Sequence, residues 1–135
     1  MEKLWRDLEK MNRIQQSLRL SEEKYSKIFE SCPVWLAITA QKDGRYLEVN
    51  NNFLQIIGFK RNEVIGKTSV ELGIWPSPAD RARIINLLKK EGRLRNVEII
   101  FNTKSGKPLN CLMSVEPIEI GGKPFLISTA LDITE

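Results

Sequence analysis

The chain has 135 residues, of which 41% are hydrophobic, and this is enough to form the core of one compact domain. Lysine and arginine exceed the acidic residues by 21 − 17 = 4, a mild excess that does not by itself indicate a nucleic-acid partner. The absence of histidine excludes the commonest general base, the commonest metal ligand and the usual proximal haem ligand.

The cysteine content indicates a reducing compartment. Cys32 and Cys111 are too few and too far apart for a disulfide framework, and the sequence has no Asn-x-Ser/Thr glycosylation acceptor. No apolar run approaches the roughly 20 residues that a membrane-spanning helix needs. We therefore expect a cytoplasmic protein without direct membrane contact.

The first 20 residues predict an amphipathic helix, because charged residues alternate at helical spacing with Leu4, Leu8, Met11, Ile14 and Leu18. When the segment is divided into heptads, one of the two core positions is apolar in every repeat, whereas the other is apolar in only half of the repeats. Two interpretations fit equally well, a two-stranded coiled coil and a single helix packed on its own domain. The first predicts a homodimer with the interface Leu4, Leu8, Met11 and Leu18.

The next segments predict a short helix followed by a hairpin. Ser21 before two glutamates is typical of a helix N-cap, and Pro33 ends the helix that would run to about Ser31. Residues 34–40 and 46–49 favour strands, and the turn-forming residues 42–45 lie between them.

The middle of the chain predicts several small helices and one longer helix. Helical spacing is visible in residues 50–59, with short helical turns at 61–65 and 69–72. The longer helix begins after Ser77, has Pro78 at its first position and ends at Gly92. Basic residues cluster at its end, but no aromatic residues are interleaved with them, so we expect no nucleic-acid partner.

The last third of the chain predicts three strands, because apolar residues alternate with polar ones in 97–102 and 109–115 and β-branched residues fill 125–133. Turns at 105–106 and 121–122 separate them. Strands joined by short turns are antiparallel, so the fold class is α+β with the helices on one face of the sheet.

Several segments together resemble the PAS family of sensor domains. They are Ser-Glu-Glu-Lys-Tyr at 21–25, Phe-Glu-Ser at 29–31, Asp-Gly-Arg-Tyr-Leu-Glu-Val-Asn at 43–50, Gly-Phe at 58–59, Asn-Glu-Val-Ile-Gly at 62–66, Lys-Ser-Gly-Lys at 104–107, Glu-Pro-Ile at 116–118 and Asp-Ile-Thr at 132–134. The resemblance covers residues 21–135. It implies a PAS-like five-stranded antiparallel sheet with helices on one face, preceded here by the amphipathic helix of residues 1–20.

The resemblance also implies a function. The resemblance implies a domain that passes signals to effector domains of the same chain, such as histidine kinases. We therefore expect this sequence to be part of a longer signalling protein, with a histidine kinase as the expected effector. Asp132 and Thr134 would relay the signal. With no histidine, no paired carboxylates and no phosphate-binding loop, we expect the domain to be regulatory and not an enzyme.

The resemblance further implies a ligand pocket that is mostly apolar. The positions that would face it are Ala37, Thr39, Ile57, Ile65, Ser69, Ile84, Leu88, Ile99, Phe101, Cys111, Met113, Ser128 and Ala130. Such a pocket suits a small, mostly apolar molecule with one or two hydrogen-bonding groups. A packed core shows the same alternation, so a ligand-free dimerisation and relay module stays an alternative.

Two cofactors of PAS relatives can be tested on the sequence. In the light-sensing branch a cysteine attacks a flavin, and Ser69 stands at the corresponding place, while Phe101, Cys111 and Ala130 replace the amides that hold the flavin edge. We therefore expect no covalent flavin photochemistry. Haem bound through histidine is excluded because the chain has none. Metal sites are not expected.

We predict that deletion of residues 1–20 converts a dimer into a monomer, because Leu4, Met11 and Leu18 would otherwise expose an apolar seam. Light scattering measures the molecular mass before and after the deletion. An unchanged mass would place the interface elsewhere.

Overall fold

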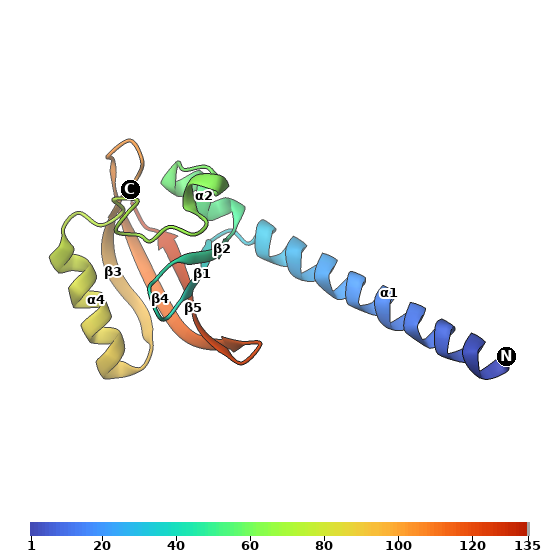
Figure 1. Ribbon diagram of the computed structural model, residues 1–135. Coiled ribbons are helices and arrows are strands. Elements are labelled where there is room, and N and C mark those ends of the chain that lie inside the picture. Colours follow the sequence, from blue (N-terminus) through green and yellow to red (C-terminus); the bar gives the residue numbers. More distant parts are fainter. Residues whose placement is uncertain (135) are drawn as a thin grey trace. The chain divides into compact units, whose positions relative to one another are not determined.

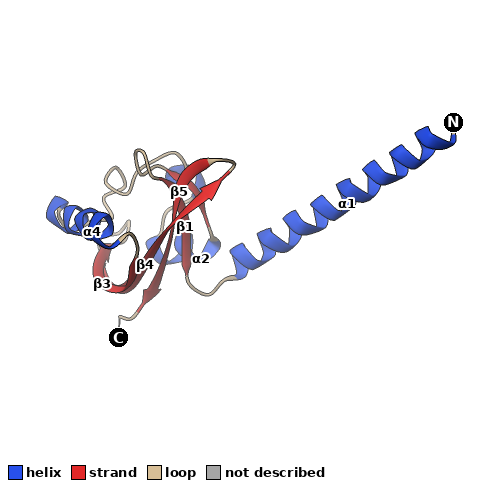
Figure 2. Ribbon diagram, turned by 90° about the horizontal axis from the view of Figure 1, so that it is seen from below, coloured by secondary structure: helices blue, strands red, loops and turns tan. Residues whose placement is uncertain are grey.

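The computed structural model describes residues 1–134 and divides the chain into two units, residues 1–31 and the residues from Cys32 onward. The first unit is the helix α1 (Glu2–Ser31), drawn as one continuous helix in Figure 2. Among the described residues, no helix is both long enough and apolar enough to span a membrane.

The expected helix start at Ser21 is wrong, because α1 passes through this residue without a break. Ser21 has strong helix formers on both sides and no glycine or proline nearby, so continued helix formation prevails over its capping tendency. Exposed ion pairs one turn apart, such as Glu9–Arg13 at 3.9 Å and Glu23–Lys27 at 3.5 Å, add modest support on both sides of Ser21.

The second unit contains a five-stranded antiparallel sheet, which confirms the predicted fold class (Figure 1). Its strands are β1 (Trp35–Ala40), β2 (Tyr46–Val49), β3 (Leu94–Asn102), β4 (Pro108–Ile120) and β5 (Lys123–Asp132). The spatial order is β2-β1-β5-β4-β3, so β5 lies at the centre and pairs with both β1 and β4.

Three helices join β2 to β3: α2 (Asn51–Ile57), α3 (Arg61–Val64) and α4 (Pro78–Glu91). Their buried side chains, among them Phe53, Val64 and Ile84, share one hydrophobic core with the alternate, inward-facing residues of the strands. The α2 helix contacts β1, and α4 contacts β3, beside which it is drawn in Figure 1. Residues 69–72 form the short turn that was expected there: the Leu72 amide donates to the Thr68 carbonyl at 3.1 Å, and Gly73 follows with a positive φ of 71°.

The buried side chain of Asn50 joins three elements. Its Oδ1 accepts hydrogen bonds from the Phe53 amide, at 3.0 Å, and from the Leu36 amide, at 2.9 Å. Its Nδ2 donates to the Val34 carbonyl at 3.0 Å. Asn50 is therefore the N-cap of α2 and also fixes the start of β1 against the end of β2.

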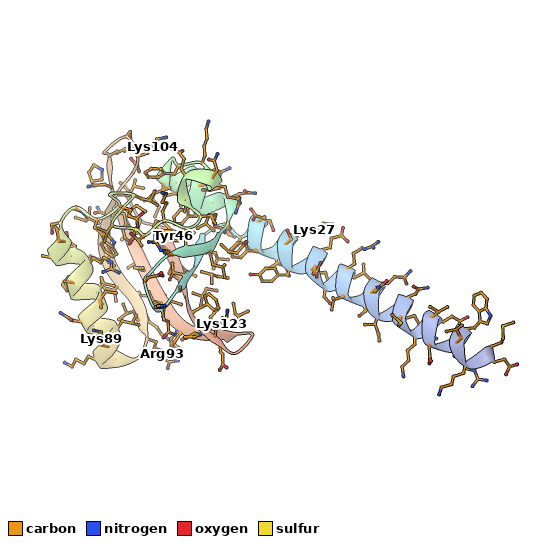
Figure 3. The ribbon with its side chains drawn as sticks, viewed as in Figure 1. Lys27, Tyr46, Lys89, Arg93, Lys104 and Lys123 are labelled. Carbon is orange, nitrogen blue, oxygen red and sulfur yellow. The ribbon has the colours of Figure 1, made fainter. Side chains whose placement is uncertain are left out.

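The α4 helix follows its sequence signals at both ends. Ser77 precedes Pro78 as N-cap, and Gly92 takes a left-handed φ of 80° after the last turn. Lys89 and Arg93 lie at the C-terminal end of α4 (Figure 3), where positive charge opposes the helix dipole. Glu116 pairs with Arg93 at 3.3 Å, so part of this basic cluster is neutralised within the domain.

The hairpin of β4 and β5 is longer than the strands on either side of it. The last pair between β3 and β4 is Leu94 with Val115, whereas β4 and β5 stay paired as far as Ile120 with Lys123. The turn between them, Gly121-Gly122, needs positive φ at both positions, which glycine adopts without strain.

We predict that Asn50→Ala lowers the free energy of unfolding by about 2 to 4 kcal/mol, because it removes a helix cap and leaves the buried amide of Phe53 and the partly buried amide of Leu36 without a partner. Chemical denaturation measures the change. Asn62→Ala is the matched control, since Asn62 is exposed on α3, and it should change stability by less than about 0.5 kcal/mol. Equal effects of the two variants would contradict the role of Asn50.

Candidate functional site

A partly open cavity of about 80 Å³ lies between the inner face of the sheet and α4. Every strand of the sheet contributes to its wall, and so do α4, the turn before β2 and the loop before α4. The lining residues are Trp35, Thr39, Gly44, Tyr46, Ser69, Trp75, Arg81, Ile84, Ile85, Leu88, Phe101, Met113, Val115, Leu126 and Ser128. The wall is thus mainly apolar, with a few polar groups.

Aromatic side chains form a connected cluster along one side of the cavity. The ring of Phe101 lies 5.0 Å from Trp75 and 5.0 Å from Trp35, measured between ring centroids. Phe53 continues the cluster behind the wall and contacts both Trp35, at 4.4 Å, and Tyr46, at 5.3 Å. These edge and tilted contacts fix the rings, so this side of the cavity is preorganised.

The polar groups of the cavity differ in how well their hydrogen bonds are satisfied. The Trp75 indole donates to the Ser69 hydroxyl at 2.8 Å, which holds the loop before α4 in place. In contrast, the buried Nε1 of Trp35 has no partner among the described residues. A buried donor without a partner is rare in folded proteins, so Trp35 offers an unused hydrogen bond beside the cavity.

Arg81 is the only charged residue of the described cavity wall. It extends from α4 toward the turn before β2, where a β-carbon placed on Gly44 would lie 3.3 Å from its Nη2. Burial raises the pKa of Tyr46, and the positive charge of Arg81 partly opposes that effect. Tyr46, labelled in Figure 3, therefore carries a neutral hydroxyl near a cation at physiological pH.

The structure brings together seven of the thirteen residues that the sequence placed in a pocket: Thr39, Ser69, Ile84, Leu88, Phe101, Met113 and Ser128. The other six lie outside the cavity wall. Five of them are buried in the core, namely Ala37, Ile57, Ile99, Cys111 and Ala130. Ile65 is 37% exposed and lies at the surface after α3.

Sequence reasoning missed the aromatic and cationic part of the wall. Trp35 lies in a strand, where alternation gives it no role beyond the core, and Trp75 lies in a loop, where periodicity carries no information. Arg81 precedes Ile84 by three residues and Leu88 by seven, so the three side chains lie on one face of a helix. This spacing is the sequence signal that could have identified Arg81.

Cys111 is a buried residue with a neutral thiol. Burial raises its pKa to about 11, and the carboxylate of Asp132, its cross-strand neighbour, adds to the shift. Because the thiolate is the reactive form, Cys111 is unsuited to nucleophilic chemistry. Among residues 1–134 no group of three or more histidine, cysteine or acidic side chains could hold a metal ion.

The Asp-Ile-Thr segment is fixed to β4 by several hydrogen bonds. The Thr134 amide donates to Oδ1 of Asp132 at 2.9 Å, and the Thr134 hydroxyl accepts from the Asn110 amide at 2.8 Å. The amide of Ile133 donates to the Asn110 carbonyl at 2.8 Å. These exposed bonds hold the chain where it leaves β5.

The cavity does not fit a flavin. Ser69 at the place of the reactive cysteine accepts a hydrogen bond from Trp75, and a volume of about 80 Å³ is close to that of only two or three water molecules. Cys111 and Ala130, which stand where flavin-binding relatives would have amides, are buried outside the wall. The residues present therefore give no support for flavin chemistry.

Comparison with protein families found one match, the model described as PAS domain, over residues 32–135. No curated protein matches the chain.

Many solved structures share the fold. A PAS domain of an HTR-like protein from Haloarcula marismortui is similar with a TM-score of 0.76 and 19% identity, covering 90% of this chain and 99% of that one. A PAS domain from a two-component sensor histidine kinase has a TM-score of 0.71 and 12% identity, with coverage of 84% and 97%. The LOV domain of a blue-light activated histidine kinase from Erythrobacter litoralis has a TM-score of 0.63 and 19% identity, with coverage of 76% and 98%.

Proposed function

This chain belongs to the PAS domain family, and we propose that it is the sensory and relay domain of a larger signalling protein, in which a small molecule bound in the cavity controls an effector such as a histidine kinase. The observation that carries the proposal is the cavity itself, with its apolar wall and unused hydrogen-bonding groups. Ligand sites combine these two features.

The position of the cavity in the sheet supports a relay role. Trp35, in the cavity wall, lies near the start of β1 and pairs with Ala130 near the end of β5. The chain therefore enters and leaves the sheet on neighbouring strands, both of which contribute to the cavity. Ser128 in the wall is only four residues before Asp132, or about 13 Å along an extended strand.

Asp132 and Thr134 are the proposed relay residues. Their hydrogen bonds to each other and to Asn110 hold the end of β5, so a shift of this strand would change the direction in which the following chain leaves. The bonds are exposed and individually weak, which suits a contact that must form and break during signalling.

The α1 helix is the proposed dimerisation element. Leu4, Leu8, Met11 and Leu18 are between 44% and 62% exposed on it. A second copy of the helix would cover this seam in a two-stranded coiled coil. The division into a helix at 1–20 and a PAS domain at 21–135 remains part of the proposal, together with a cytoplasmic location and a regulatory role without catalysis by the domain itself.

We predict that a screen of small molecules finds compounds that raise the thermal unfolding midpoint, since a ligand that binds only the folded state stabilises it by about 2.7 kcal/mol at 100 times its Kd. Ser128→Leu, which fills the cavity, should abolish the effect. Thr129→Leu is the matched control, because its side chain lies on the opposite face of the same strand.

Two results would contradict this function. If no compound stabilises the protein, the ligand-free dimerisation and relay module becomes the better interpretation. If the purified protein shows a flavin or Soret absorption band, the interpretation of Ser69 and of the missing histidine is wrong.

We predict that Asp132→Ala in the full-length protein uncouples the effector from its stimulus while lowering stability by only about 1 kcal/mol, because the lost contact is an exposed one. Effector activity with and without stimulus, together with a thermal melt, measures both effects. Glu119→Ala, an exposed change near the far end of the same hairpin, serves as control. Normal switching by a well-folded Asp132→Ala variant would refute the relay role.

A further inference from the structure

The charges around the cavity are unbalanced. Arg81 has no hydrogen bond or ion pair with any described residue, and no carboxylate contributes to the wall. The neighbouring acids are engaged elsewhere: Asp43 pairs with Arg45 at 3.4 Å, and Asp80 accepts a hydrogen bond from the Ser77 hydroxyl at 3.0 Å. The half-buried guanidinium of Arg81 thus faces the cavity without a counter-charge.

The polar groups at the cavity that lack a hydrogen-bond partner are mainly donors. An indole N–H and a guanidinium can only donate, and the Nε1 of Trp35 is buried and without a partner. The hydroxyl of Tyr46 makes no hydrogen bond within the described chain, and its raised pKa keeps its proton available for donation. The unpartnered groups of Trp35 and Arg81 therefore favour a ligand that supplies acceptors, and the charge of Arg81 favours acceptors that are negatively charged.

From these observations, and resting on the proposed sensory function, we propose that the cavity binds a small aliphatic monocarboxylate, with its carboxylate at Arg81 and its hydrocarbon chain toward Ile84, Leu88 and Met113. A carboxylate accepts several hydrogen bonds and pairs with a guanidinium in two-pronged geometry. The cavity of about 80 Å³ limits the body of the ligand to a few carbon atoms, because a cavity that admits benzene is about 150 Å³.

The alternative of a purely structural arginine is disfavoured by the surroundings of Arg81. Three other arginines close to the sheet have acidic partners: Arg45 pairs with Glu71, and Arg93 and Arg95 pair with Glu116. Arg83, two residues further on α4, is exposed and does not line the cavity. Arg81 is thus placed where a charged ligand group could replace the missing partner.

The test measures binding of sodium butyrate to the whole chain by calorimetry, with butyramide as a neutral probe of the same shape and sodium chloride to match ionic strength. We expect butyrate to bind. The Kd of butyramide should be higher by a factor of about ten or more, because the charged contact is lost. Arg81→Gln should weaken butyrate binding by the same factor. Arg83→Gln, the matched control on the same helix, should leave it unchanged.

The outcomes separate the two proposals. Equal binding of butyrate and butyramide, or unchanged butyrate binding by Arg81→Gln, would overturn the carboxylate assignment while leaving a ligand-binding cavity intact. Binding of neither probe would overturn the assignment as well, and the small-molecule screen then decides whether the cavity binds anything. If Arg81→Gln unfolds, the comparison of butyrate with butyramide on the unchanged protein still tests the carboxylate assignment.

Discussion

A single buried amide, that of Asn50, holds the cavity side of the domain together. Hydrogen bonds of its side chain connect the start of β1, the end of β2 and the first turn of α2. This geometry directs Phe53 into the core, where its ring supports both Trp35 and Tyr46. Two walls of the cavity therefore depend on one side chain that does not itself reach the cavity. A buried amide serves here because it both donates and accepts, which no apolar residue of this size can do.

Most of the fold could be predicted from the sequence, because each strand of the sheet carries its own local signal. Alternation in 97–102 and 109–115, together with paired glycines at 121–122, defines antiparallel hairpins without any long-range information. One error arose where a local preference competes with its neighbours. Ser21 resembles a cap, but it lies among helix formers, and the helix continues through it.

The site was less accessible to prediction than the fold. Alternation shows that Met113 and Ser128 face inward, but not whether they meet a packed neighbour or open space. It therefore cannot separate them from Ala37 and Cys111, which are core residues outside the cavity wall. Trp75 could not be found because loops have no period. Arg81 shares a helix face with Ile84, yet charged residues are usually assigned to solvent, and only the fold shows the turn at Gly44 lying against it.

The overhanging end of the β4–β5 hairpin creates an exposed strand edge, and exposed edges invite pairing between molecules. Beyond Val115, where the pairing with β3 stops, β4 continues with Pro117, a residue that has no amide hydrogen to donate. Pro124 at the beginning of β5 has the same property on the returning strand. The overhang thus offers an incomplete row of donors to any strand that approaches it. Protection against edge-to-edge aggregation is therefore built into the same hairpin whose other end carries Asp132 and Thr134.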